Sequence, residues 1–166
     1  MKHIMGPNSE STLTGVFPDD VQPNAVDVRL AKVFQLGDGL FTISEEGKQH
    51  RGNIELEADE DGWFFLEENC SYEVVMDNII KVGPNEAGWV VSRSTLIRNG
   101  CFLTSGLYDS GYEGVIAACL HVRGGDMMVK KGTRIGQYLS FHSEALHLYD
   151  GDYGLAKAHD QQTYKV

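Results

Sequence analysis

The sequence predicts an all-β protein with one short helix, and three features support this. Short segments rich in β-branched and aromatic residues recur along the chain, and turn-forming residues separate them. No long stretch shows helical periodicity. The length of 166 residues favours a single domain with one core and one active-site system.

Four strands are expected in the first part of the chain, at Ala25–Leu30, Gly62–Leu66, Tyr72–Met76 and Gly88–Val91. The segment Glu45–Asp61 lies between the first two of these strands and is polar and acidic, with little periodicity. We interpret it as an excursion on the surface, such as a long hairpin.

Three further strands are expected in the second part, at Val115–Val122, Met127–Lys130 and Arg134–Phe141. The links Arg-Gly-Gly-Asp and Lys-Gly-Thr separate them, and short links of this kind are typical of tight turns. This spacing predicts a meander of tight hairpins.

One segment, Ser94–Asn99, is expected to form a helix of one or two turns. Either Ser92 or Ser94 can cap its amino-terminal end. Asn99 followed by Gly100 can end it.

The composition changes after Phe141, where SEALHLYDGDYGLAKAHDQQTYKV is rich in Gly, Asp and Gln and poor in aliphatic residues. Such a segment is expected to contribute little to a core. It is either a disordered terminus or a segment that becomes ordered over a ligand, and composition alone favours the first. We therefore divide the chain into a single β domain at residues 1–148 and a tail at residues 149–166, which is a candidate lid.

The formal net charge of −10 argues against nucleic acid or a membrane surface as a partner, because binding to a polyanion needs a large basic surface. A small phosphorylated ligand remains compatible, since a few Arg and Lys residues and a divalent cation can neutralise its phosphates. The three cysteines lack C-x-x-C spacing, so we expect them to be reduced thiols. No apolar run approaches the length of about 20 residues that a membrane span needs, so we expect a cytoplasmic protein.

The segment TSGLYDSGYEG, at Thr104–Gly114, is the most informative in the chain. Its small residues and glycines precede a long apolar strand and imply a tight hairpin. Close approach of its backbone to a ligand would let main-chain groups bind the edge of a base, with Asp109 orienting a water molecule. A simple β-turn at Asp109 is the alternative. The candidate backbone contacts are Thr104, Ser105, Gly106, Gly111 and Gly114.

SGLYDSGYEG resembles the third motif of dUTPases, in which G-x-I-D-x-x-Y-x-G is typical. In that family the aspartate activates the attacking water, and the tyrosine ring packs under the deoxyribose and leaves no room for a 2′-hydroxyl. The resemblance assigns these roles to Asp109 and Tyr112.

Four other segments resemble further motifs of the superfamily of dUTPases and dCTP deaminases, in the expected order. NAVDVRL is similar to the first motif, VSRSTLIR to the second, KKGTRIGQYLSF to the fourth, and LAKAHDQQ to the tail of the deaminases, with Ala158 where a tyrosine is usual. The first, second and tail segments are closer to the deaminase forms. The resemblance implies an indirect metal contact for Asp27 and substrate binding for Arg93, Ser94, Arg98, Gln137, Lys157 and Gln161.

The resemblance covers about Asn24 to Gln162 and implies a distorted β-barrel or jelly roll of the dUTPase-like, β-clip type. It also implies a homotrimer whose active sites lie at the interfaces between chains. The implied ligand is a deoxynucleoside triphosphate, with Mg²⁺ as cofactor.

Two reactions are known in this superfamily, and one position separates them. The glutamate that moves protons in the deaminases falls on Cys119, and a thiol on an apolar strand has a raised pKa and cannot easily replace it. The sequence therefore predicts a dUTP diphosphatase that converts dUTP to dUMP and diphosphate. A dCTP deaminase, a bifunctional enzyme and a non-catalytic regulatory trimer are the alternatives, and the base preference between dUTP, dCTP and a modified pyrimidine stays open.

One departure from the dUTPase pattern is the missing Gly-rich fifth motif at the end of the chain. Its arginine grips the γ-phosphate and its phenylalanine stacks on uracil. Either the tail closes the site with Tyr153, Lys157 and Gln161, or turnover is slow or the base preference unusual.

Overall fold

The computed structural model describes Gly6 and Asn8–Val166, so residues 1–5 and 7, at the start of the predicted 1–148 domain, lie outside it. Strands dominate the described residues, which confirms the all-β prediction. In chain order the elements are β1 Thr12–Leu13, the 3₁₀ turn η1 Pro18–Asp20, β2 Val26–Leu36, β3 Thr42–Ser44, β4 Gly47–Gln49, β5 Asn53–Leu56, β6 Trp63–Leu66, β7 Ser71–Lys81, β8 Glu86–Ser92, α1 Ser94–Arg98, β9 Phe102–Thr104, β10 Glu113–His121, β11 Met127–Lys130, β12 Arg134–His142 and α2 Ala158–Thr163.

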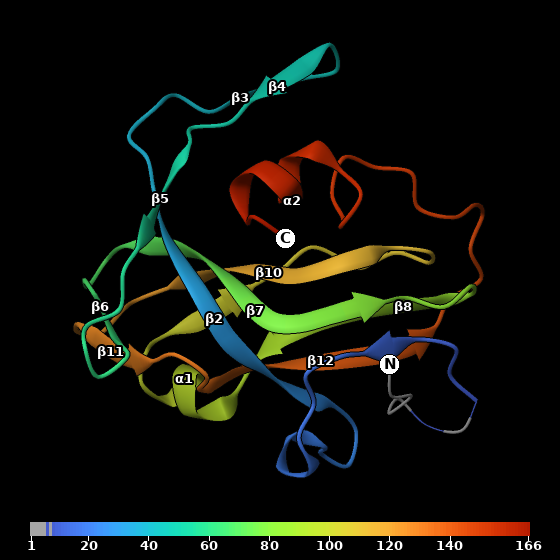
Figure 1. The fold of residues 1–166 in the computed structure, drawn as a ribbon, viewed down its shortest axis with the longest axis horizontal. Coiled ribbons are helices and arrows are strands. Elements are labelled where there is room, and N and C mark those ends of the chain that lie inside the picture. The colour runs from blue at the N-terminus through green and yellow to red at the C-terminus, as the bar shows by residue number, and fades with distance from the viewer. Residues whose placement is uncertain (1–5, 7) are drawn as a thin grey trace.

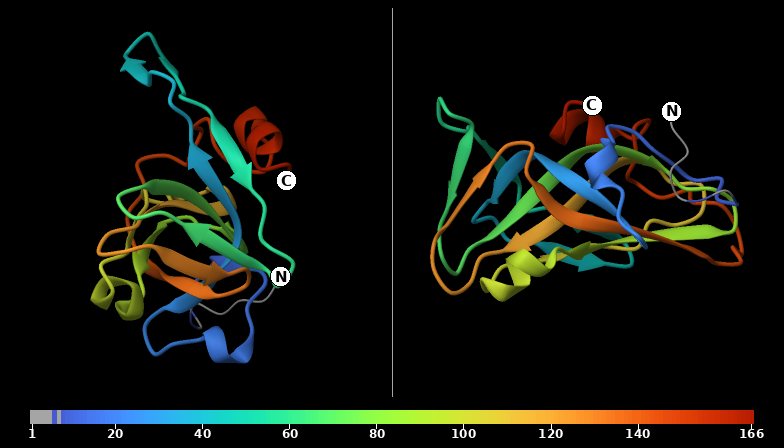
Figure 2. Two further views of the ribbon diagram at one scale, coloured as in Figure 1. Left: turned by 90° about the vertical axis from the view of Figure 1, so that its left-hand side faces the viewer. Right: turned by 90° about the horizontal axis from the view of Figure 1, so that it is seen from below.

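An eight-stranded sheet forms the body of the molecule, with the order β8-β12-β2-β7-β10-β9 and with β1 and β5 attached to β7 and β2. The sheet bends into a nearly closed barrel, which Figures 1 and 2 show from three directions. Three of its strand pairs contain register shifts, at Leu30/Lys32, Val115/Ala117 and Arg134/Gly136. Such irregularities increase the local twist and bend of long strands, which helps a sheet to close.

The expected strands exist, but the predicted meander is wrong. β10 pairs with β7 and β9, β11 pairs with β6, and β12 pairs with β2 and β8. The Lys-Gly-Thr link forms a turn, in which the Thr133 N–H donates to the Lys130 carbonyl at 3.1 Å, and the Arg-Gly-Gly-Asp link forms a bend. Their sequence does not specify the partner, because pairing is decided by which faces bury apolar side chains in the closed barrel.

The core lies inside the barrel and comes from alternate residues of the long strands. Leu30, Val74, Ile116 and Tyr138 on β2, β7, β10 and β12 are almost completely buried. Burying each such side chain contributes about 1.5–3 kcal/mol relative to leaving it in water.

The predicted helix forms as α1 and ends where the sequence indicated, at Asn99 and Gly100, whose φ is +77°. Neither serine caps it. Arg93 is the residue before the first turn, and the Ser92 hydroxyl instead accepts a hydrogen bond from the Leu103 N–H at 2.7 Å. Ser92 thus joins α1 to β9.

The predicted surface excursion forms an exposed arm, residues 37–52, which carries the β3–β4 hairpin and returns to the barrel through β5 (Figure 1). The arm contacts the tail. Lys48 Nζ lies 2.7 Å from Asp152 Oδ2 and over the Tyr153 ring, and the rings of His50 and His159 are 5.4 Å apart.

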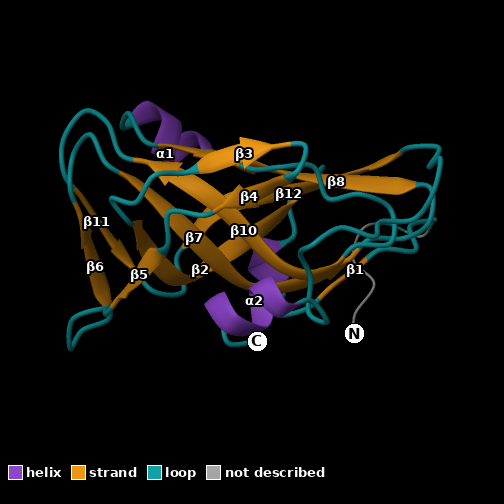
Figure 3. Cartoon of the chain, turned by 90° about the horizontal axis from the view of Figure 1, so that it is seen from above, coloured by secondary structure: helices purple, strands orange, loops and turns teal. Residues whose placement is uncertain are grey.

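The expectation that the tail contributes little to a core is wrong, and so is the expectation of a single helix. The tail contains α2, which lies across one side of the barrel (Figures 1 and 3). Tyr164 follows α2, is only 3% exposed and packs with Phe34, Val75 and Val115. One aromatic side chain therefore docks a segment that is otherwise poor in apolar residues. Among the described residues, no helix is long and apolar enough to cross a membrane.

Candidate active site

A cavity of about 1070 Å³ lies between the barrel, the arm and the tail. Its floor comes from β7 and β10, one wall from the loop after β9, and its cover from the arm and from the residues around α2. Aromatic side chains from the loop after β9, the arm and the tail form much of its surface. This size and composition are typical of a small-molecule site.

The loop Thr104–Gly106 lines this cavity, as expected for the segment predicted to bind a base. Contacts to β8 hold it: the Ser105 hydroxyl accepts from the Val90 N–H at 3.3 Å, and Trp89 Nε1 donates to the Ser105 carbonyl at 3.3 Å. A Cβ atom on Gly106 would meet open space, so its main chain faces the cavity without obstruction.

Gly111 and Gly114 have a different role from the one expected, because neither lines the cavity. Gly111 has φ +84° and permits the turn. A Cβ atom on Gly114 would lie 2.3 Å from the Tyr112 hydroxyl. These two glycines therefore shape the turn and make space for Tyr112.

Tyr112 is a buried wall of the cavity. Its ring centroid lies 5.4 Å from those of both Tyr108 and Tyr149, and its hydroxyl donates to the Val115 carbonyl at 2.9 Å. Burial, followed by the charge of Asp160, raises the pKa of this phenol well above its usual range. The ring is held neutral and rigid.

Asp109 is exposed at the turn before Tyr112, and its carbonyl accepts the Tyr112 N–H at 3.0 Å. Its side chain is not part of the cavity lining. Within one chain, the carboxylate predicted to activate water therefore does not line the cavity.

Cys119 occupies the position expected for the deaminase glutamate, and it lines the cavity. Burial, followed by the charge of Glu73, raises the pKa of its thiol, as the sequence indicated. His121 lies on the same face and links Ser71 to Thr104, with Nδ1 2.9 Å from Ser71 Oγ and Nε2 3.0 Å from Thr104 Oγ1.

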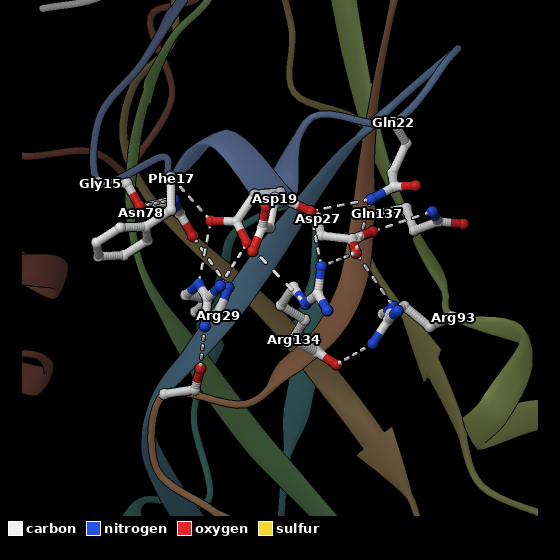
Figure 4. A network of polar contacts seen from close by, with 12 residues as sticks. Gly15, Phe17, Asp19, Gln22, Asp27, Arg29, Asn78, Arg93, Arg134 and Gln137 are labelled. Carbon is white, nitrogen blue, oxygen red and sulfur yellow. Dashed lines mark hydrogen bonds and ion pairs between the residues drawn. The ribbon is translucent and has the colours of Figure 1, made fainter.

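The second group of predicted residues lies outside the cavity, in a network of arginines around a completely buried carboxylate, Asp27 (Figure 4). Arg93 Nε and Arg134 Nη1 lie 3.3 and 3.5 Å from Asp27 Oδ2. Gln137 donates its amide to Asp27 Oδ1 at 3.0 Å. Asp27 thus orients two guanidinium groups and the predicted phosphate-binding glutamine, and its metal contact stays a prediction.

Three further residues, Asp20, Arg29 and Arg134, belong to this network and were not among the predicted site residues. Arg29 forms two hydrogen bonds to the fully buried Asp20, with Nη2 2.6 Å from Oδ1. Burial would raise the pKa of Asp20, but the hydrogen bonds from Arg29 and Phe17 and the charges of Arg29 and Arg134 outweigh it and lower the pKa. Arg29 and Arg134 both lie within the segments that resemble family motifs, so the sequence could have identified them as candidate site residues.

The remaining predicted residues lie on α1, on α2 or immediately before α2, and outside the cavity lining. Ser94 and Arg98 are exposed on α1. Lys157 Nζ lies 3.2 Å from Asp150 Oδ1, and Gln161 donates to the Leu155 carbonyl at 3.2 Å. α1 and α2 lie on opposite sides of the barrel (Figures 1 and 2). Within one chain, Ser94 and Arg98 therefore lie on the other side of the barrel from Lys157 and Gln161.

The sequence profile of the dCTP deaminase-like family matches residues 8–143. The chain belongs to the dCTP deaminase-like family. The match covers every strand of the barrel and stops before the tail.

Relatives of this family member include archaeal proteins. It is 31% identical over 137 residues to the probable deoxyuridine 5′-triphosphate nucleotidohydrolase of Methanococcoides burtonii, covering 80% of each chain. It is also 31% identical over 113 residues to the deoxyuridine 5′-triphosphate nucleotidohydrolase of Methanocaldococcus jannaschii, covering 67% of this chain and 72% of the relative.

Solved structures confirm the family fold. The 2′-deoxycytidine 5′-triphosphate deaminase of Agrobacterium tumefaciens aligns with a TM-score of 0.61 at 18% identity, covering 77% of this chain and 43% of that chain. The dUTPase of Staphylococcus bacteriophage 80alpha with dUPNHPP aligns with a TM-score of 0.51 at 12% identity, covering 90% of this chain and 92% of the other.

Proposed function

We propose that this protein hydrolyses dUTP to dUMP and diphosphate. The observation that carries the proposal is the pairing of a cavity lined by aromatic rings with a preorganised arginine network on the same barrel. The first suits a nucleoside and the second a triphosphate. The archaeal relatives named as deoxyuridine triphosphate nucleotidohydrolases support the same reaction.

The active protein in this proposal is a homotrimer with interfacial active sites. One chain supplies the cavity with Tyr112 and Asp109, and a neighbouring chain supplies Arg93, Ser94, Arg98 and Gln137. Support comes from the single chain, where the arginine network lies outside the cavity.

The proposed chemistry is in-line attack of water on the α-phosphorus, with diphosphate leaving. Asp109 orients the water and accepts its proton. The Arg93 guanidinium, held by Asp27, and the Gln137 amide bind phosphate oxygens as charge moves to the leaving group. Bound Mg²⁺ would neutralise phosphate charge. It would arrive with the triphosphate and be held mainly by its oxygens and water, as is usual for this ion.

We further propose that residues 1–148 form the catalytic barrel and that the tail, residues 149–166, serves as a lid. Support comes from Tyr149, Tyr153 and Tyr164, which line the cavity from the tail. In this proposal, Lys157 and Gln161 contact a triphosphate only at an interface between chains.

The test is a substrate panel of dUTP, dCTP, dTTP and UTP with Mg²⁺, with diphosphate and ammonia measured separately. Diphosphate release from dUTP is expected. No dUTP turnover would overturn the proposal, and tight dUTP binding without turnover would instead support a regulatory trimer. Ammonia release from dCTP would establish a deaminase, which Cys119 argues against.

A further inference from the structure

His121 lies at the end of β10 and links three strands beside the cavity. Its Nδ1 lies 2.9 Å from the Ser71 hydroxyl of β7, and its Nε2 lies 3.0 Å from the Thr104 hydroxyl of β9. Ser71 and Phe102 stand directly opposite His121 in the two strand registers. Thr104 lies two residues further along β9, where a long side chain reaches it diagonally. Thr104 lines the cavity, whereas His121 and Ser71 lie behind it.

The imidazole ring of His121 is fixed on its face as well as at its edge. It stacks on the Phe102 ring, with the centroids 4.8 Å apart and an interplanar angle of 27°. A neutral imidazole has one donor nitrogen and one acceptor nitrogen, and a hydroxyl can fill either role. His121 can therefore hydrogen-bond to Ser71 and to Thr104 at the same time. The ring cannot turn without losing the stacking contact or a hydrogen bond.

The strand that carries Thr104 is the last one in the order of the sheet. β9 pairs with β10 through three residue pairs. Short elements with few contacts open more readily than central strands. The loop that follows β9, Thr104–Gly106, is held on its β8 side by the hydrogen bond between the Val90 N–H and the Ser105 hydroxyl. His121 holds it on the other side of β9, at the residue where the strand ends.

We propose that His121 is a positioning residue for nucleotide binding, which acts through Thr104 and fixes the Thr104–Gly106 main chain at the edge of the cavity. This inference rests on the proposed function, in which that loop binds the nucleotide. His121 itself lies outside the cavity lining and takes no part in the reaction. It reduces the ordering that the loop must undergo when a ligand binds. Its loss should weaken the binding of substrate and transition state alike, which raises KM and leaves kcat unchanged.

The test measures three His121 variants by calorimetry with the α,β-imido analogue of dUTP and by KM and kcat for dUTP. His121→Phe keeps a ring against Phe102 and removes both hydrogen bonds. The amide of asparagine has the reach of Nδ1 and can contact Ser71, whereas that of glutamine has the reach of Nε2 and can contact Thr104.

We expect His121→Phe and His121→Asn to raise the dissociation constant and KM by about fivefold, as for the loss of one neutral hydrogen bond. Their kcat should stay within about twofold of the wild type, because Asp109 and the arginine network are unchanged. His121→Gln restores the contact with Thr104 and should stay within about twofold of the wild type in all three quantities.

Thr104→Val tests the same contact from the other side, because it removes the hydroxyl and nearly keeps the shape. It should also raise the dissociation constant by about fivefold. The double variant His121→Phe/Thr104→Val should bind no more weakly than Thr104→Val alone, since both substitutions remove one shared contact. His142→Phe, at an exposed histidine of β12 outside the cavity, is the matched control and should bind as the wild type does.

Two results would overturn the inference. One is wild-type affinity in His121→Phe. The other is a fall in kcat with an unchanged dissociation constant and KM, which indicates a loss of folded protein and a purely structural role. If His121→Phe folds poorly, the comparison of His121→Asn with His121→Gln decides the question, and equal affinities of these two variants would contradict the inference.

The same measurements separate this inference from the function on which it rests. If the wild type binds the dUTP analogue and does not hydrolyse dUTP, the proposed function is overturned, and the dissociation constants of the variants still decide the role of His121. If the wild type hydrolyses dUTP and the variants bind as it does, the inference is wrong and the proposed function stands. A wild type that does not bind the analogue would overturn both.

Discussion

The carboxylates of the cavity and of the arginine network have opposite kinds of partner. In the cavity, Glu73 has neutral hydrogen-bond donors and Tyr112 is held neutral by burial. In the network, Asp27 and Asp20 are completely buried and contact three arginines. One region presents rings and a few polar atoms, and the other presents fixed guanidinium groups.

Under the proposed function, this difference explains how an acidic protein binds a polyanion. The buried aspartates do not repel the ligand directly, because the guanidinium groups of Arg29, Arg93 and Arg134 are about one third exposed or less and cover them. The aspartates hold the arginines in position before a phosphate arrives, and such preorganisation reduces the reorganisation required during reaction. The net charge of the chain therefore says little about this surface.

The largest effect is expected at Asp109, on the turn before Tyr112. Asp109→Asn should lower dUTP turnover by about 10²–10⁴-fold and leave binding of the dUTP imido analogue largely intact, because a general base is lost without a change of shape. Steady-state diphosphate release and calorimetry measure the two quantities. Glu113→Gln, at an exposed acid that pairs with Lys81, is the control and should remain close to wild type. Near-normal turnover of Asp109→Asn would assign the base elsewhere.

Substitutions in the arginine network should lower the free energy of unfolding more than substitutions in the cavity. Asp27→Asn leaves Arg93 and Arg134 close together without their shared carboxylate, so the free energy of unfolding should fall by about 3 kcal/mol. The Michaelis constant for dUTP should rise as well. Urea denaturation measures the first effect. Asp19→Asn, an exposed neighbour, should change stability by less than about 0.5 kcal/mol. Equal effects at both positions would contradict the positioning role of Asp27.

Substitutions in the cavity should affect the discrimination between dUTP and UTP more than substitutions in the arginine network. Tyr112→Ala removes the ring that packs against Tyr108 and Tyr149, so discrimination between dUTP and UTP should fall by about 10–100-fold. Tyr112→Phe keeps the ring and loses only the hydrogen bond to Val115, so it should retain discrimination. If Tyr112→Ala still rejects UTP, another group excludes the 2′-hydroxyl.

The smallest effect concerns acid stability. The pKa of Asp20 is lower in the folded protein, so its contribution to stability is fully present above the unfolded value of about 3.9. It is lost as the pH falls towards the lowered folded value. Denaturation between pH 5 and 3 should show a steeper loss for the wild type than for Asp20→Asn. Identical slopes would mean that the ion pair with Arg29 does not persist in solution.

Local patterns predicted most of the strands and the positions of the residues in the motifs. They could not predict which strands pair, because the links before β11 and β12 specify reversals and not partners. They also missed the docking of the tail, since its contact with the core depends on scattered residues such as Tyr164 and Tyr149 and not on an apolar pattern. The sequence also could not place Glu73 beside Cys119, because that placement depends on the pairing of β7 with β10.

We propose that the site, which is divided within one chain, is completed between chains. The decisive measurement mixes Asp109→Asn and Arg93→Gln, each inactive alone, under conditions that exchange subunits. Random mixing should restore roughly a quarter of the interfaces, because Asp109 and Arg93 come from different chains of a symmetric ring. Recovery of dUTP hydrolysis towards that fraction is the predicted result. If exchanged oligomers stay inactive, both residues act within one chain and the account is wrong.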